Sequence, residues 1–203
     1  MSKSKNPSAQ TSRDSRQTHK ARPRRELSAG QWMAIIIGGT ILIPAVFLLV
    51  NSRPPADIPD VEKFTGLIQR HTTQPVNYPQ TPPVGGEHNP AWQNCGIYDQ
   101  PIQDENAVHS LEHGAMWVTY RPDLPADAVE TLRSLVRGRT FALLTPYPEL
   151  PAPIVATVWG AQLRVDDPGD PRLAQFMVNY MQGPLTPELG APCDGGLGVP
   201  LDR

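Results

Sequence analysis

Two histidines four residues apart, with a glutamate between them, are the strongest chemical signal in this 203-residue sequence. They lie in the stretch AVHSLEHGAMW (107–117), which contains His109, Glu112 and His113. On a helix, positions i and i+4 share a face, so both imidazoles would project from one side. Because histidine pairs at this spacing commonly bind one zinc or copper ion, we predict a metal site here.

Further ligands for this ion must come from elsewhere in the chain. A long irregular stretch upstream offers His88, in GGEHNPAW, and Cys95, in WQNCGIY, while Met116 closely follows the motif. We predict His88 as the third imidazole ligand, with Glu112 as a fourth ligand or as the acceptor that orients a ligating ring. Sulfur from Cys95 or Met116 would favour copper, whereas a three-histidine set suits copper and zinc alike. The predicted cofactor is therefore a copper or zinc ion.

Cys95 cannot be both a thiolate ligand and part of a disulfide. It and Cys193 are the only cysteines, and an even pair in an exported domain predicts a disulfide first. Such a bond would close a long loop and stabilise the fold by about 2–5 kcal/mol. We favour the Cys95–Cys193 disulfide over ligation by Cys95.

Two other interpretations of the histidine pair stay open. Each ring could simply hydrogen-bond to backbone near a helix end, and the domain would then be a non-enzymatic interaction module, such as a subunit or assembly factor of a membrane complex. H-S-L-E-H also fits the H-x-x-E-H pattern of one class of zinc metalloproteases, in which Glu112 would be the catalytic base and Glu188 a further ligand. Those enzymes are several times longer, and Gly114 ends the predicted helix at once, so we expect no enzyme here.

Other chemistries have no anchor in the sequence. There is no G-x-S-x-G, no C-x-x-C and no glycine loop placed to hold phosphate. The tryptophans of the exported part, Trp92, Trp117 and Trp159, could line a ligand site, but large aromatic side chains in a domain of this size usually pack in the core.

The N-terminal fifty residues predict a membrane anchor. The first 26 residues carry eight Lys/Arg against two acidic residues, and we expect residues 1–31 to form a disordered cytoplasmic tail. Residues 32–50, WMAIIIGGTILIPAVFLLV, carry no charge and are long enough to span a bilayer as a helix. No small-residue cleavage site follows, so we predict a single-pass cell-membrane protein with the lipid bilayer as a partner.

Residues 51–60 form a Pro-rich spacer, and residues 61–203 form the predicted extracytoplasmic domain. From residue 51 onward there are 10 Lys/Arg and 18 Asp/Glu, a formal net charge of −8, which makes nucleic acid an unsuitable partner. This part is long enough to bury one core of its own.

The order of predicted elements indicates an α+β fold. A long Pro/Gly-rich loop (74–102) precedes a short helix near 104–114, a strand at 115–122 and a helix within 124–139. Apolar strand patterns follow at 140–148 and 153–166, the second turning at Gly160, and a last helix lies within 170–183. We expect a small, mainly antiparallel sheet with helices packed on one face.

Three motifs together resemble an uncharacterised family of bacterial domains of unknown function, which usually carry an N-terminal membrane anchor. They are P-P-x-x-G-x-H, W-x-x-C-G-x-Y and H-S-L-E-H-G, and the similar region covers roughly residues 61–182. The resemblance implies an exported, anchored α+β domain and no activity. It also implies a shared site built from His88, Trp92, Cys95, Gly96, Tyr98, His109, Glu112, His113, Gly114 and Tyr120. This chain departs from the family at "VGG" (84–86), where a small hydroxyl residue is usual, which affects the loop and not the histidines.

Overall fold

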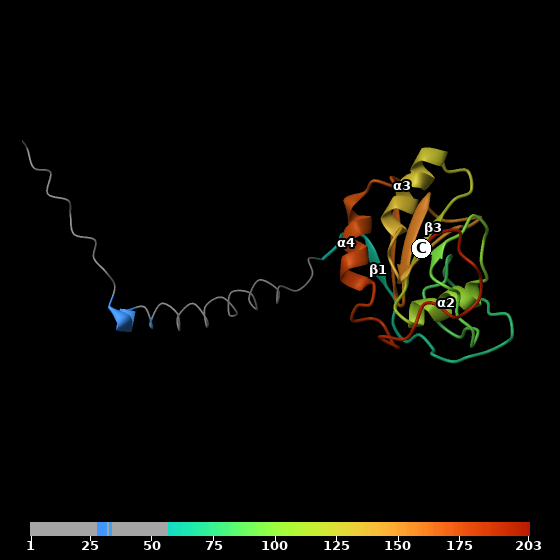
Figure 1. Ribbon diagram of the computed structural model, residues 1–203. Coiled ribbons are helices and arrows are strands. Elements are labelled where there is room, and N and C mark those ends of the chain that lie inside the picture. The colour runs from blue at the N-terminus through green and yellow to red at the C-terminus, as the bar shows by residue number, and fades with distance from the viewer. Residues whose placement is uncertain (1–27, 32, 34–56) are drawn as a thin grey trace, which may run out of the picture. The chain divides into compact units, whose positions relative to one another are not determined.

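A six-stranded mixed sheet forms the centre of the domain (Figure 1). This computed structural model describes residues 28–31, 33 and 57–203. In chain order the domain contains β1 (Val61–Lys63), β2 (Gly96–Ile97), α2 (Asp104–Glu112), β3 (Met116–Tyr120), α3 (Ala126–Val136), β4 (Ala142–Pro146), β5 (Ile154–Val158), β6 (Ala161–Val165) and α4 (Pro171–Tyr180).

The sheet combines an antiparallel half with a parallel half. Its strand order is β1-β6-β5-β3-β4-β2, in which β1 to β3 pair antiparallel and β3, β4 and β2 pair parallel. The crossover from β3 to its parallel neighbour β4 runs through α3, because parallel strands cannot be joined by a tight turn. The β5–β6 hairpin turns at Gly160, whose φ of 70° is a conformation that favours glycine. The α+β class, the mainly antiparallel sheet and this hairpin are confirmed.

Helices cover both faces of the sheet, and the prediction that they cover one face was wrong. Because side chains alternate along a strand, Met116 and Val118 of β3 point to one face and Trp117 to the other. The first face packs against apolar residues of α3 and α4, and the second against α2. Figure 1 shows α4 and α2 on opposite sides of the strands. This second face, under α2, is where the histidines of the motif lie.

The N-terminal predictions fall largely outside the described residues. These are the basic tail, the segment 32–50 and most of the spacer. Within the part of the chain that the structure describes, no helix is both long enough and apolar enough to cross a membrane.

Candidate metal centre

A short parallel bridge places His71 beside His88. The Thr72 amide donates to the His88 carbonyl at 2.7 Å, and the His88 amide donates to the Arg70 carbonyl at 3.0 Å. An ion pair between Arg70 and Glu87 holds the same two segments together. As a result the two imidazole rings lie with their centroids 4.9 Å apart.

The helix α2 supplies His109 and Glu112 to the same place. The loop after His88 rests on the first turns of α2, since the Asn89 amide donates to the Glu105 carbonyl at 3.2 Å. Asp104 and Glu105 lie in the first turn of the helix, where acidic side chains are favoured by the helix dipole. The ring of His109 lies 4.8 Å from His71 and 4.9 Å from His88, centroid to centroid.

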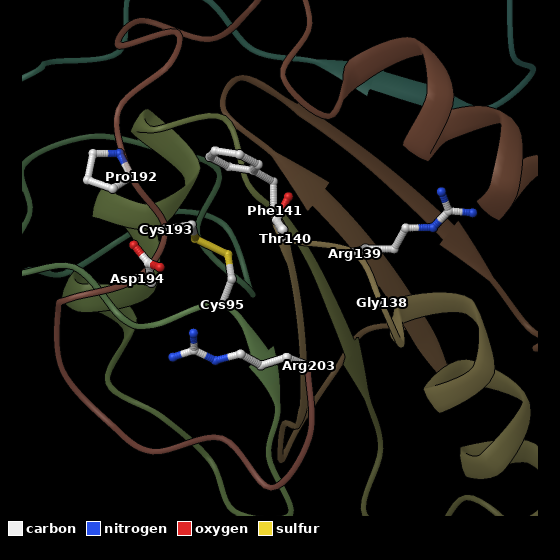
Figure 2. Close-up of a pocket in the computed structure, with 9 residues that line it drawn as sticks. All are labelled: Cys95, Gly138, Arg139, Thr140, Phe141, Pro192, Cys193, Asp194 and Arg203. Atoms are coloured by element: carbon white, nitrogen blue, oxygen red, sulfur yellow. A yellow bond between two sulfur atoms is a disulfide. The ribbon is translucent and has the colours of Figure 1, made fainter.

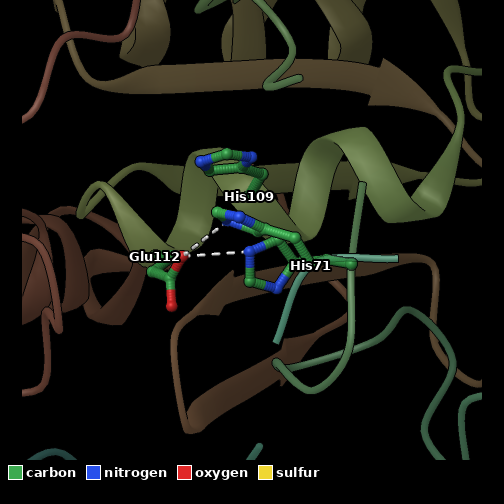
Figure 3. Close-up of side chains that lie close together, drawn as sticks. His71, His109 and Glu112 are labelled. Carbon is green, nitrogen blue, oxygen red and sulfur yellow. Dashed lines mark ion pairs between the residues drawn. The ribbon is translucent and has the colours of Figure 1, made fainter. Parts of the chain in front are cut away.

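Four side chains therefore converge into a group with metal-ligating atoms, which we call the Glu112 group: His71, His88, His109 and Glu112. One ligand atom from each lies within 4.8 Å of the others. Figure 3 shows His71 and His109 facing the Glu112 carboxylate beside α2. Ligand atoms around a tetrahedral ion at bond lengths near 2 Å stand about 3.3 Å apart. Small side-chain rotations would bring these four atoms to that spacing.

The group is largely removed from water and opens on one side. His88 is fully buried, and His109 and Glu112 are 4% and 3% exposed. The side chain of His71 is 49% exposed and forms the open side. Trp159 contacts the His88 ring edge-on, at a centroid distance of 5.8 Å, and Trp92 lies 5.7 Å from His109. Trp117 is core, as predicted.

Backbone carbonyls fix the tautomers of three histidines. Nδ1 of His88 lies 2.7 Å from the Gly86 oxygen, Nδ1 of His109 lies 2.6 Å from the Asn89 oxygen, and Nδ1 of His113 lies 2.6 Å from the Pro192 oxygen. Because a carbonyl can only accept, each Nδ1 carries the proton and donates it. Each neutral ring is thereby left with its lone pair on Nε2, in the arrangement that protein metal sites use to orient imidazole ligands.

The Nε2 atom of His88 is the least satisfied atom of the group. It is buried and has no hydrogen-bond partner among residues 57–203. It lies 2.9 Å from Oε2 of Glu112, which also approaches Nε2 of His71 at 3.8 Å. A lone pair and a carboxylate oxygen repel each other at that distance unless a proton or a cation lies with them. Buried polar atoms left in this state are rare, and an ion is one recognised reason for them.

His109 is held in the neutral form. Burial lowers its pKa to about 4 because the charged ring would lose its hydration, and the neighbouring His113, His88 and His71 act in the same direction. The Asn89 carbonyl opposes this shift. At neutral pH the ring therefore has no Nε2 proton to lose before it can bind an ion.

His113 belongs to a second group, with His109 and Glu188. One ligand atom from each of these three residues lies within 4.8 Å of the others. His113 and His109 have their ring centroids 4.6 Å apart, and Nε2 of His113 lies 3.5 Å from Oε2 of Glu188. The structure thus joins His88, His109 and Glu112 as predicted, but it adds His71 and places His113 in this separate set, which we call the Glu188 group.

The end of α2 explains how Glu188 reaches this place. A helix leaves its last carbonyls without helical partners, and here the segment 182–188 provides donors. The Glu188 amide donates to the Glu112 carbonyl at 3.0 Å, the Gln182 amide donates to the Gly114 carbonyl at 2.9 Å, and the Gln182 side chain bonds to the His113 carbonyl. Gly114, with φ of 92°, makes the turn that ends the helix.

The two sulfur residues considered as ligands have other roles. Cys95 forms the predicted disulfide with Cys193. Met116 is fully buried in the core on the opposite face of the sheet, against α3 and α4. His71 was missed by the sequence analysis, since it ends a stretch with no motif; the scarcity of histidine, five in the chain, was the signal that could have identified it.

A hollow of about 370 Å³ lies beside the disulfide, apart from the histidines (Figure 2). Its lining residues are Cys95, Gly138, Arg139, Thr140, Phe141, Pro192, Cys193, Asp194 and Arg203. None of them is a member of the Glu112 or Glu188 group. The chemistry of this domain is therefore best sought at α2.

Comparison with known proteins places the chain in a family without giving it an activity. Among curated proteins and solved structures, none matches the chain. A family model with the description "Protein of unknown function (DUF3105)" matches residues 69–195, which is more than half of the sequence and includes both groups. The chain belongs to this family of domains of unknown function.

Proposed function

We propose that the domain binds one divalent transition-metal ion, zinc or copper, through His71, His88, His109 and Glu112. The observation that carries this proposal is the buried Nε2 of His88, which has no hydrogen-bond partner among the described residues and faces a buried carboxylate. The backbone carbonyls behind His88 and His109 support it, because they leave each Nε2 lone pair available for the ion.

The donor set narrows the choice of metal. It offers three imidazole nitrogens and one carboxylate oxygen, and the disulfide removes the Cys95 thiolate. Sites without sulfur suit Zn(II) and Cu(II), whereas Cu(I) prefers thiolate or thioether ligands. Three histidines with one carboxylate match the four-coordinate geometry of zinc.

We further propose that the domain works outside the membrane, held there by residues 32–50. The Cys95–Cys193 disulfide supports this location, because such bonds persist in oxidising compartments and are rare in the cytosol.

Metal titration of the purified full-length chain by calorimetry, with Zn(II) and Cu(II) in turn, tests the proposal. We expect one tight site per chain. His71→Gln changes an exposed ligand and Glu112→Gln keeps the side-chain shape; each should weaken binding by at least about tenfold, since even residues that only orient a ligand contribute about 10- to 100-fold.

His19→Gln serves as the matched control, because His19 belongs to the N-terminal tail, and this variant should bind like the wild type. Only trace binding by the wild type, or unchanged binding by both site variants, would overturn the proposal and leave the non-enzymatic interaction module in its place.

A zinc hydrolase of the H-x-x-E-H kind is the second candidate. The position of Glu188 favours it, since this carboxylate lies within ligand distance of His109 and His113, as that mechanism requires. Hydrolysis of peptide or ester substrates that is lost with chelator and with Glu112→Gln would support it. An active Glu112→Gln variant would exclude it.

A further inference from the structure

The two groups share one residue, His109. The Glu112 group reaches solvent through His71, whose side chain is 49% exposed, and the Glu188 group reaches it through Glu188, whose side chain is 53% exposed. Between these two openings lie buried imidazoles, with centroid distances of 4.9 Å from His88 to His109 and 4.6 Å from His109 to His113.

His109 can serve only one ion at a time. Its Nδ1 donates a proton to the Asn89 oxygen at 2.6 Å, so the ring is a neutral imidazole and cannot bridge two ions as an imidazolate. One lone pair, on Nε2, is left for ligation. Whichever group holds the ion with His109, the other group has lost its central ligand.

The Glu188 group is built in the same way as the Glu112 group. The Pro192 carbonyl accepts from Nδ1 of His113, which leaves Nε2 free on the side of the Glu188 carboxylate, 3.5 Å away. Trp92 packs over both imidazoles, at 5.7 Å from His109 and 5.0 Å from His113. The Glu188 backbone is fixed to the end of α2 by its bond to the Glu112 carbonyl.

We infer that the Glu188 group is a second position for the same ion, and that His109 is the ligand common to both positions. This inference rests on the proposed metal-binding function. An ion moving between the positions exchanges His71, His88 and Glu112 for His113 and Glu188 while His109 stays bound, so it is never released as a free ion. Such an arrangement suits a protein that receives an ion at one opening and passes it to an acceptor at the other.

Co(II) titration of the full-length chain tests the inference, because the visible absorption of Co(II) depends on its ligands. Wild type should bind one equivalent. The double variant His71→Gln/His88→Gln loses two of the four ligands of the Glu112 group. It should still bind one equivalent, at least about tenfold more weakly and with a changed spectrum. Adding Glu188→Gln should reduce this residual affinity by at least a further factor of about ten. Adding Glu130→Gln, on the exposed surface of α3, should leave it unchanged.

The outcomes separate the two proposals. No binding by wild type refutes the proposed function itself. One equivalent in wild type, with no residual binding in a folded double variant or with residual binding that ignores Glu188→Gln, overturns only the second position. Should the double variant not fold by circular dichroism, the wild-type stoichiometry still decides: two equivalents of similar affinity contradict a shared ligand, and one equivalent whose spectrum changes with Glu188→Gln supports it.

Discussion

Removing the Cys95–Cys193 disulfide should cost this domain a large part of its stability. The two cysteines are 98 residues apart in the sequence, so the bond closes a loop that contains most of the domain. Restricting a loop of about 100 residues in the unfolded chain is worth about 4.7 kcal/mol at 25 °C. Whole domains are stable by about 5–15 kcal/mol. The Cys95→Ala/Cys193→Ala variant should therefore lose about 4 kcal/mol and melt roughly 10–15 °C lower.

Urea unfolding followed by tryptophan fluorescence measures this loss, because Trp117 and Trp159 are buried in the folded domain. Reductant should destabilise the wild type by a similar amount and leave the double variant unchanged, which is the control. The reasoning also predicts an effect on the candidate site, since Pro192, next to Cys193, fixes the His113 ring. A loss of stability below about 1 kcal/mol, or a wild type that reductant does not affect, would refute it.

Three further outcomes follow from individual contacts. Because burial lowers the pKa of His109 from 6.5 to about 4, the metal-free domain should lose about 3 kcal/mol of stability as the pH falls from 6.5 to 4; in His109→Asn, which keeps a donor for the backbone, that part of the pH dependence should be missing from urea unfolding curves. Gly114→Ala should destabilise by about 1–3 kcal/mol in thermal melts and weaken any Glu188-dependent binding, since φ is 92° and a Cβ would meet the Gln182 side chain; a neutral result would contradict the tight turn. Thr145→Val should cost about 1–3 kcal/mol in urea unfolding, because it leaves the buried Trp117 indole N–H without its 2.9 Å acceptor, whereas Thr131→Val on the exposed face of α3 should be nearly neutral.

Local sequence patterns predicted most of the regular structure. The helices α2, α3 and α4 and the strands β3 to β6 lie where apolar periodicity and Gly or Pro stops indicated them. β1 and β2 were missed because strands of three and two residues are too short to show a period. The parallel pairing of β3 with β4, and the face that α2 covers, depend on contacts between distant segments, which a single sequence does not display.

The site was predicted in part for the same reason. His109 and Glu112 come from one helix, so their spacing was informative, and His88 stood out in its motif. His71 joins them through a bridge between two loops, which leaves no local pattern. His113 follows the last helical residue, where its ring turns to the Pro192 carbonyl and Glu188. Helical spacing alone could not separate it from His109.

The short outer strands of the sheet have a consequence for life outside the cell. Its two edges are formed by β1 and β2, with three and two residues, and the C-terminal segment bonds to Ile97 on both sides through Leu201 and Asp202. Little unpaired strand backbone is then exposed for another chain to extend, which is a known protection against edge-to-edge aggregation. A crowded envelope without ATP-driven chaperones would reward that protection.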